Sequence, residues 1–218
     1  YDKVITREGC AQPEIHMTTP NMGRRSFSIL VVAVLATGLL SCSTGVEESP
    51  QPGIVRVTLQ ANPADTTILI LTDTVRVTDR DSMGVTIFQG KIFSGVKFAT
   101  LFRSVTSYRA EDITYNVLKR DIGTYKTYVV YESYVPPGDY TKLQVGVTAT
   151  LLKFRDVAPI QLQLRPDDPL LLDFDIGFQV SENRVTEIML QIDPLRSLIR
   201  YRDLYYFERK MRVLGVRQ

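Results

Sequence analysis

The sequence predicts an all-β fold, an antiparallel β-sandwich that occupies residues 53–218. Three observations predict this fold class. Short segments rich in Val, Ile, Thr, Tyr and Phe recur along this part of the chain, and several alternate apolar and polar residues with the period of a half-buried strand. Turn-forming residues separate these segments, and no amphipathic helical pattern lies between them. The composition, 44% hydrophobic and 23% charged, is that of an ordinary folded domain.

The first element in chain order is an apolar leader at residues 22–41. Residues 27–40 form a run without a charge, and this run is too short to cross a bilayer as a helix, which takes about 20 apolar residues. Arg24 and Arg25 precede the run and the small residue Ser41 follows it. A positive segment, a short apolar core and a small residue at the cut are typical of a secretory signal peptide. We therefore predict a signal-peptide helix here.

The leader ends at residues 39–42, which read Leu-Leu-Ser-Cys and resemble the lipobox of bacterial lipoproteins. The resemblance implies that a diacylglyceryl group is attached to the Cys42 sulfur, that the chain is cleaved before Cys42, and that the new amino terminus is acylated, for example with palmitate. Two or more acyl chains hold a protein stably at a membrane. The implied location is the bacterial cell envelope, as an outer-membrane lipoprotein on its periplasmic or surface side. The alternative is an ordinary signal peptide that leaves Cys42 as a free thiol.

Two further segments flank the leader. Residues 1–21 begin at Tyr1 instead of Met, and we expect an over-extended reading frame or a long positive segment, with Met17 or Met22 as the true start. Residues 42–52 are rich in Ser, Thr, Gly, Glu and Pro and show no apolar period. This composition predicts a flexible, lipid-attached linker between the membrane and the folded domain.

Strands are expected from residue 53 onward. Val55, Val57 and Leu59 alternate with Arg56 and Thr58, which marks the first strand. The predicted strands span residues 55–59, 67–71, 74–78, 85–88, 96–102, 113–118, 127–131, 142–150, 160–164, 170–174 and 187–192. The predicted turns lie at residues 79–82, 89–90, 121–123, 136–138 and 181–183. For the tail, residues 194–218, we expect a turn followed by a strand.

One turn carries a resemblance to a known family. Residues 134–145 read Tyr-Val-Pro-Pro-Gly-Asp-Tyr-Thr-Lys-Leu-Gln-Val, in which Pro137 presets φ for a turn and Gly138 accepts the positive φ that follows. The segment resembles the P-x-G-x-Y-T-x-L motif of an uncharacterised domain family common in bacterial lipoproteins. Members also tend to open with a strand like residues 53–59 and to close with an acidic strand and a serine-containing turn, here residues 190–198. The P-x-G-x-Y turn recurs in transthyretin-like and carboxypeptidase-regulatory-like sandwiches, so the resemblance implies an immunoglobulin- or transthyretin-like sandwich and transfers no catalytic residue.

The positions of the rare residues exclude several classes of enzyme. The only histidine is His16 and the two cysteines are Cys10 and Cys42, so residues 43–218 contain neither type. Nucleophile systems that use His, zinc sites built on His or Cys, and haem held by His are thereby excluded for the folded part. No Walker A loop or dinucleotide-binding glycine pattern occurs, and we expect no cofactor. With 26 basic and 24 acidic residues, we also expect no nucleic-acid partner.

Paired carboxylates are the chemistry that remains. Asp173 and Asp175 share one face if they lie on a strand, Asp79 and Asp81 lie two apart in a turn, and residues 167–168 are two aspartates flanked by prolines. A glycosidase needs two acids at a set separation across a cleft, and a calcium site needs several converging oxygens. Solvated acids on turns and strands are much commoner than either, so we assign no catalytic and no metal-binding residue.

Tyrosines recur in steps of three at Tyr125, Tyr128, Tyr131 and Tyr134. On a strand this step sends alternate side chains to opposite faces. One set is then expected in the core, and the other is a candidate exposed aromatic platform that binds a protein or glycan partner.

The sequence thus predicts a membrane-anchored bacterial envelope lipoprotein with a non-enzymatic binding or scaffolding sandwich. One alternative is a carboxylate-dependent glycan hydrolase, which requires Asp173 or Asp175 to meet another acid in a concave pocket. The other is a purely structural subunit of an envelope assembly.

Overall fold

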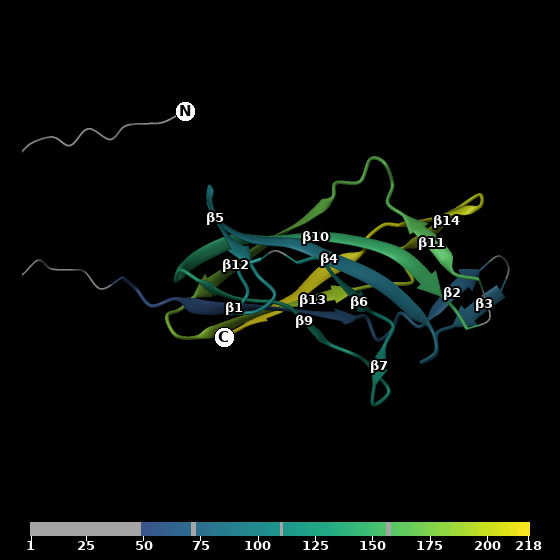
Figure 1. Cartoon of the computed structure of the whole chain (residues 1–218), viewed down its shortest axis with the longest axis horizontal. Coiled ribbons are helices and arrows are strands. Elements are labelled where there is room, and N and C mark those ends of the chain that lie inside the picture. Colours follow the sequence, from purple (N-terminus) through teal and green to yellow (C-terminus); the bar gives the residue numbers. More distant parts are fainter. Residues whose placement is uncertain (1–48, 71–72, 110, 156–157) are drawn as a thin grey trace, which may run out of the picture. The chain divides into compact units, whose positions relative to one another are not determined.

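The computed structural model describes residues 49–70, 73–109, 111–155 and 158–218, and this part of the chain is all-β (Figure 1). Its strands form two large sheets that share one hydrophobic core, so the predicted β-sandwich is confirmed. A membrane-spanning helix does not occur among the described residues. The predicted signal peptide, the lipidation site Cys42 and the linker as far as residue 48 lie outside the described residues.

The smaller sheet has four strands, in the order β16 (Met211–Arg217), β13 (Val185–Ile192), β1 (Gly53–Ala61) and β9 (Tyr128–Val135). β1 is antiparallel to β9 but parallel to β13 along its length. This parallel pair differs from the antiparallel arrangement that the sequence predicts. Parallel neighbours need a crossover connection, and here most of the domain lies between the two strands, so local patterns do not reveal the pairing.

The larger sheet has eight strands and is built on a long central pair, β10 (Gly138–Lys153) and β4 (Ser82–Ser94). β5 (Lys97–Leu101) and β6 (Ile113–Asn116) pair with the edge of β4 that faces away from β10. On the other edge of β10 lie β12 (Leu171–Val180) and then β11 (Ile160–Gln163). β15 (Leu204–Phe207) pairs in parallel with β11, and β14 (Leu198–Tyr201) ends the sheet.

Two small ribbons complete the described part. They are formed by β2 (Thr67–Ile70) with β3 (Asp73–Arg76) and by β7 (Arg120–Asp121) with β8 (Thr124–Tyr125). In β7–β8, Ile122 and Gly123 both have positive φ, as in the two-residue turns that match strand twist. The predicted turn at residues 121–123 is thus confirmed, as are those at 79–82, 136–138 and 181–183.

The core follows from the alternation that the sequence shows. In β1, Val55, Val57 and Leu59 are fully buried, and β10 and β13 bury similar residues at alternate positions. Burying each such side chain stabilises the fold by about 1.5–3 kcal/mol. The main buried side chains of these strands are Val55, Val57, Leu59, Leu143, Val145, Val147, Ile188, Leu190 and Ile192.

The predicted turn at residues 89–90 is wrong, because these residues form a β-bulge inside β4. Gln89 has a φ of 46°, and the pairing of β4 with β10 shifts register between Val145 and Gly146. Gly90 is required here for a packing reason. A Cβ at this position would lie 2.7 Å from the ring of Tyr131, which packs across the core from β9.

The tail contains more strands than the sequence predicts. The expected turn is present at residues 194–197, but three strands follow it, namely β14, β15 and β16. The buried carboxylate of Asp65 accepts hydrogen bonds from the backbone amides of Leu195 (2.7 Å) and Arg196 (3.1 Å) and so fixes this turn. Burial raises the pKa of Asp65 although these hydrogen bonds oppose the shift.

A second buried carboxylate, Asp81, fixes the turn before β4. It accepts hydrogen bonds from the Thr78 amide (2.6 Å), the Thr78 hydroxyl (3.0 Å) and the Arg155 amide (3.0 Å). Burial alone would raise the pKa of Asp81, but these hydrogen bonds and the charge of Arg155 outweigh it and hold the pKa below its ordinary value.

Replacing Gly90 by Ala is expected to lower the free energy of unfolding by about 1–3 kcal/mol, because the new methyl group overpacks against Tyr131. Urea denaturation of both proteins measures the change. Gly177→Ala is the matched control, since a Cβ at Gly177 meets nothing within 4 Å. Equal stability of Gly90→Ala and wild type would contradict the proposed packing.

Replacing Asp81 by Asn is expected to lower the free energy of unfolding by about 1–3 kcal/mol at neutral pH, because one accepting carboxylate oxygen becomes an NH2 donor that faces other donors and the charge beside Arg155 is lost. The folded-state pKa of Asp81 is depressed, so its contribution is present above the ordinary value of 3.8 and is lost as the pH falls through the lower folded value. The difference in the free energy of unfolding between wild type and Asp81→Asn should therefore narrow below about pH 4. If this difference in stability widens on acidification, the pKa of Asp81 is not depressed in the folded protein.

Candidate functional site

The outward face of the β14–β15 hairpin is apolar, although strands facing solvent usually carry polar side chains. Cross-strand pairing joins Ile199 with Tyr206 and Tyr201 with Leu204, which places the four side chains on one face. Tyr201 is 59% exposed, Leu204 43% and Ile199 36%, and Tyr206 is half-buried. We call these four residues the hairpin face.

The opposite face of the same hairpin packs on the core. Phe207 is fully buried there, and Leu198 and Tyr205 are partly buried against the core cluster. Both faces of this hairpin are therefore largely apolar, and Arg200, which pairs with Tyr205, is the one charged side chain of its two strands. Because the inward face already supplies the packing that holds the hairpin in the sheet, the outward aromatic side chains are not needed for that packing.

A hollow of about 330 Å³ lies at the hairpin face. Two segments form it: the hairpin face itself and the turn that follows β11. The parallel pairing of β11 with β15, with Gln163 opposite Tyr206, brings this turn beside the hairpin. The lining residues are Arg165, Pro166, Asp167, Ile199, Tyr201 and Tyr206.

Ionic contacts hold the turn that lines the hollow. Arg165 lies 3.4 Å from Glu208, which follows β15. The buried guanidinium of Arg209 pairs with Asp168 at 3.4 Å and donates a hydrogen bond to the carbonyl of Pro169. Arg209 also has a φ of 54°, which is uncommon for a non-glycine residue and is maintained by these contacts. Arg209 thus positions the turn without lining the hollow.

The rim of the hollow carries one charge of each sign. The Arg165 guanidinium contributes hydrogen-bond donors and the exposed Asp167 carboxylate contributes acceptors. Asp167 has no ion-pair partner among the described residues. Apolar walls with a small number of polar groups at fixed positions are typical of ligand sites.

The four predicted tyrosines do not form one exposed platform. Tyr125 and Tyr131 are buried, and the Tyr125 hydroxyl donates a hydrogen bond to the carbonyl of Asp65 (2.9 Å). Burial raises the pKa of Tyr131, whose hydroxyl has no hydrogen-bond partner in the described part of the chain. These two residues form the set that alternation along a strand places in the core, so of the four candidate partner-binding tyrosines only Tyr128 and Tyr134 have exposed surface. Tyr125 also lies on the separate strand β8, so the three-residue step does not run along one strand.

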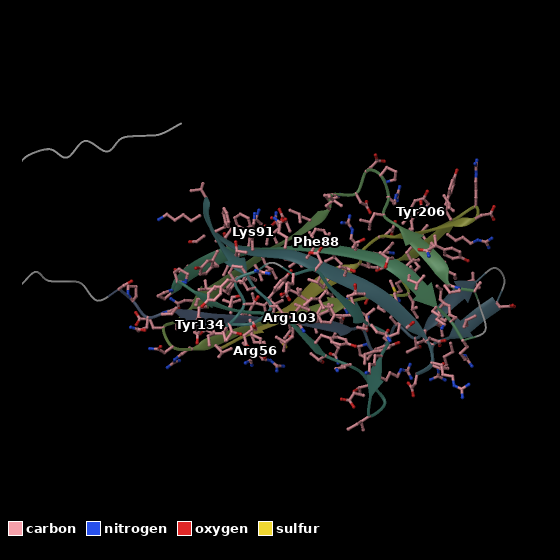
Figure 2. The ribbon with its side chains drawn as sticks, viewed as in Figure 1. Arg56, Phe88, Lys91, Arg103, Tyr134 and Tyr206 are labelled. Atoms are coloured by element: carbon pink, nitrogen blue, oxygen red, sulfur yellow. The ribbon has the colours of Figure 1, made fainter. Side chains whose placement is uncertain are left out.

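The other two tyrosines have different surroundings. Tyr128 is half-buried, donates a hydrogen bond to the carbonyl of Asn116 (2.8 Å) and packs on Tyr115 with ring centres 5.0 Å apart. Tyr134 is 57% exposed and lines a hollow of about 150 Å³ together with Tyr108 and five further residues, namely Phe102, Ser104, Val105, Ser107 and Ser133. Figure 2 shows Tyr134 far from Tyr206, so this hollow is separate from the hairpin face.

The predicted carboxylate pairs do not meet in a cleft. Asp173 and Asp175 lie exposed on β12. Asp173 accepts hydrogen bonds from Gln144 (2.7 Å) and Lys142 (3.2 Å), and these contacts lower its pKa. Neither residue lines either hollow described above.

Asp79 and Asp81 also have separate surroundings. Asp79 is exposed and lines a hollow of about 260 Å³ with Thr78, Arg80 and Arg155, whereas Asp81 is buried in its hydrogen bonds. No group of three or more His, Cys, Asp or Glu residues that could hold a metal ion occurs in the described ranges.

Comparison with known proteins finds no matching family model, no matching curated protein and no matching solved structure. The interpretation of the hairpin face therefore rests on its own geometry and chemistry.

Replacing Asp168 by Ala is expected to lower the free energy of unfolding by about 1.5–3 kcal/mol, because the buried Arg209 loses its charged partner. Asp167→Ala removes the neighbouring carboxylate, which has no such partner, and should change stability by less than about 0.5 kcal/mol. Urea denaturation of the two variants measures the difference. Equal effects would contradict the positioning role of Arg209.

Proposed function

We propose that this protein is a membrane-anchored lipoprotein of the bacterial cell envelope whose β-sandwich binds a partner, without catalysis, through the hairpin face. The observation that carries the binding role is the apolar, aromatic outward face of β14–β15 beside a hollow. The proposed attachment to the membrane is a lipid anchor at Cys42, which is inferred from the sequence alone.

The short linker would hold the fold near the membrane if Cys42 is acylated. Residues 49–52 are exposed and carry no strand, and β1 begins at Gly53. A chain acylated at Cys42 would then have about ten linker residues before the fold, which reach at most about 35 Å when fully extended. The sandwich would therefore act close to the membrane surface.

The hairpin face supports binding better than catalysis. The charged groups that line the hollow, Arg165 and Asp167, are a single cation and a single anion, and the lining residues include no second carboxylate and no hydroxyl nucleophile beside a base. Aromatic side chains provide large contact area at a small cost in side-chain entropy, because each has two rotatable bonds. These are properties of a recognition surface.

Metabolic labelling with palmitate tests the anchor. Wild type should incorporate the label and Cys42→Ala should not, because the acylated sulfur is removed. Cys10→Ala, which replaces the other cysteine of the chain, is the control and should be labelled as wild type. Equal labelling of wild type and Cys42→Ala would contradict a lipid anchor at this residue.

Co-sedimentation with isolated bacterial envelopes tests the binding role, and the reference protein and every variant carry Cys42→Ala so that the proposed lipid anchor does not itself bring the chain into the pellet. We expect a variant with both Tyr201→Ala and Tyr206→Ala to bind at least about tenfold more weakly than the reference protein, a change of about 1.4 kcal/mol. A variant with Tyr108→Ala and Tyr134→Ala removes the tyrosines of the smaller hollow and should bind as the reference protein does. Loss of binding only in the second variant would assign the role to that hollow instead.

A further inference from the structure

We infer that the hollow at the hairpin face binds a neutral carbohydrate, one or two sugar rings of a glycan chain that stack on Tyr201 and Tyr206. This inference rests on the proposed function and names the ligand class for the same site. It is argued from the size of the hollow, its charges, its aromatic walls and its rigidity.

The size of the hollow favours a compact ligand. Its volume of about 330 Å³ lies at the lower end of the range of small-molecule sites. A stable protein–protein interface buries roughly 800 Å² on each partner and uses about 20–30 residues a side. The hairpin face has only four residues, which is much less than such an interface needs.

The charges at the rim favour a neutral ligand with hydroxyl groups. A purely apolar ligand would take Arg165 and Asp167 out of water without hydrogen bonds, which is unfavourable. The two opposite charges at the rim offset each other for a ligand that carries a net charge, so the hollow has no net electrostatic attraction for an anion or for a cation. Neighbouring hydroxyl groups of a sugar both donate and accept hydrogen bonds, so they satisfy both side chains at once.

The aromatic walls match the shape and the polarity of a sugar ring. A pyranose ring has flat faces of C–H groups and a rim of hydroxyls. Tyr201 and Tyr206 likewise have apolar ring faces and polar tips, and Ile199 and Pro166 add further apolar surface. Gln163, the exposed strand neighbour of Tyr206, carries an amide that donates and accepts hydrogen bonds beside the ring.

The site is held in place before any ligand binds. β14 and β15 pair at four successive positions, from Leu198–Phe207 to Tyr201–Leu204. The Arg202 guanidinium lies 5.4 Å from the centre of the Tyr201 ring and steadies it. Arg165 is held by Glu208 at 3.4 Å. Binding therefore costs little ordering of the protein.

The smaller hollow at Tyr134 fits this ligand less well. It has about 150 Å³ and its lining residues include serines and two tyrosines but no charged side chain. It therefore offers less room and no charge-assisted hydrogen bond to a hydroxyl. Its exposed tyrosine serves as the control position.

Titration of the full chain in detergent with defined oligosaccharides tests the inference. The probes are the neutral tetrasaccharides of β-1,4-linked glucose, N-acetylglucosamine, xylose and mannose, with tetragalacturonate as an anionic comparison. The chain has no tryptophan, so its emission comes from its 11 tyrosines, and the part of a ligand-induced change that Tyr206→Phe removes is assigned to the ring of Tyr206; calorimetry gives the affinity. We expect saturable binding of at least one neutral probe, with an affinity that is unchanged between about 0.1 M and about 1 M salt because the ligand carries no charge.

Variants assign the binding to the hollow. Tyr206→Ala and Asp167→Ala should each weaken binding at least tenfold. Tyr206→Phe keeps the ring face and should stay within about threefold of wild type. Urea denaturation of Tyr206→Ala at the concentrations used for binding checks that a loss in this variant is not a folding defect. Tyr134→Ala should bind as wild type.

Two results would overturn the inference: no binding of any neutral probe, or binding that Tyr206→Ala leaves unchanged. Stronger binding of tetragalacturonate with a steep dependence on salt would also overturn it, because the ligand would then be an anion. If the envelope co-sedimentation persists while no neutral sugar binds, the carbohydrate inference fails and the proposed function stands. If the hairpin-face variant co-sediments as the reference protein does, the proposed function itself fails.

Discussion

The buried Asp65 carboxylate holds together the two parts of the fold on which the candidate site depends. It lies in the connection after β1, and it accepts the backbone amide hydrogen bonds of Leu195 and Arg196 in the turn between β13 and β14. That turn takes the chain from the four-stranded sheet to the edge of the eight-stranded sheet. Without it the hairpin face would not be formed beside the turn after β11. A buried acceptor of two amides is costly to lose, since both donors would stay unpaired.

The same region holds a second buried ionic group and a residue with a positive φ. Arg209, two residues beyond β15, is buried with a positive φ and pairs with Asp168 in the turn that lines the hollow. Two buried ionic groups, Asp65 and Arg209, therefore frame the hairpin from its two ends. Buried polar groups of this kind favour one arrangement of the chain over others, because alternatives leave them unpaired. The result is a rigid aromatic face, which is what recognition of a small ligand requires.

Most strands can be predicted from the sequence, because alternation along β1, β10 and β13 reports which face is buried. Three features cannot. The parallel partner of β1 is most of the domain away in sequence, the bulge at Gly90 depends on the Tyr131 ring across the core, and the burial of Tyr125 depends on the separate ribbon β7–β8. The hairpin is missed for a reason linked to its proposed role. β14 has the apolar residues Ile199 and Tyr201 on its outward face and Arg200 beside Leu198 on the other, so the alternation of a buried apolar face with a polar outer face is absent.

Photo-crosslinking in living cells tests the central claim most directly, namely that the hairpin face is the surface that contacts an envelope partner. Tyr201 and, as the comparison, Tyr134 are each replaced by a photoreactive aromatic residue in the full chain, and light-dependent adducts are detected by their mass. The account expects adducts from position 201 with envelope material and none above background from position 134. Adducts from position 134 alone would contradict it.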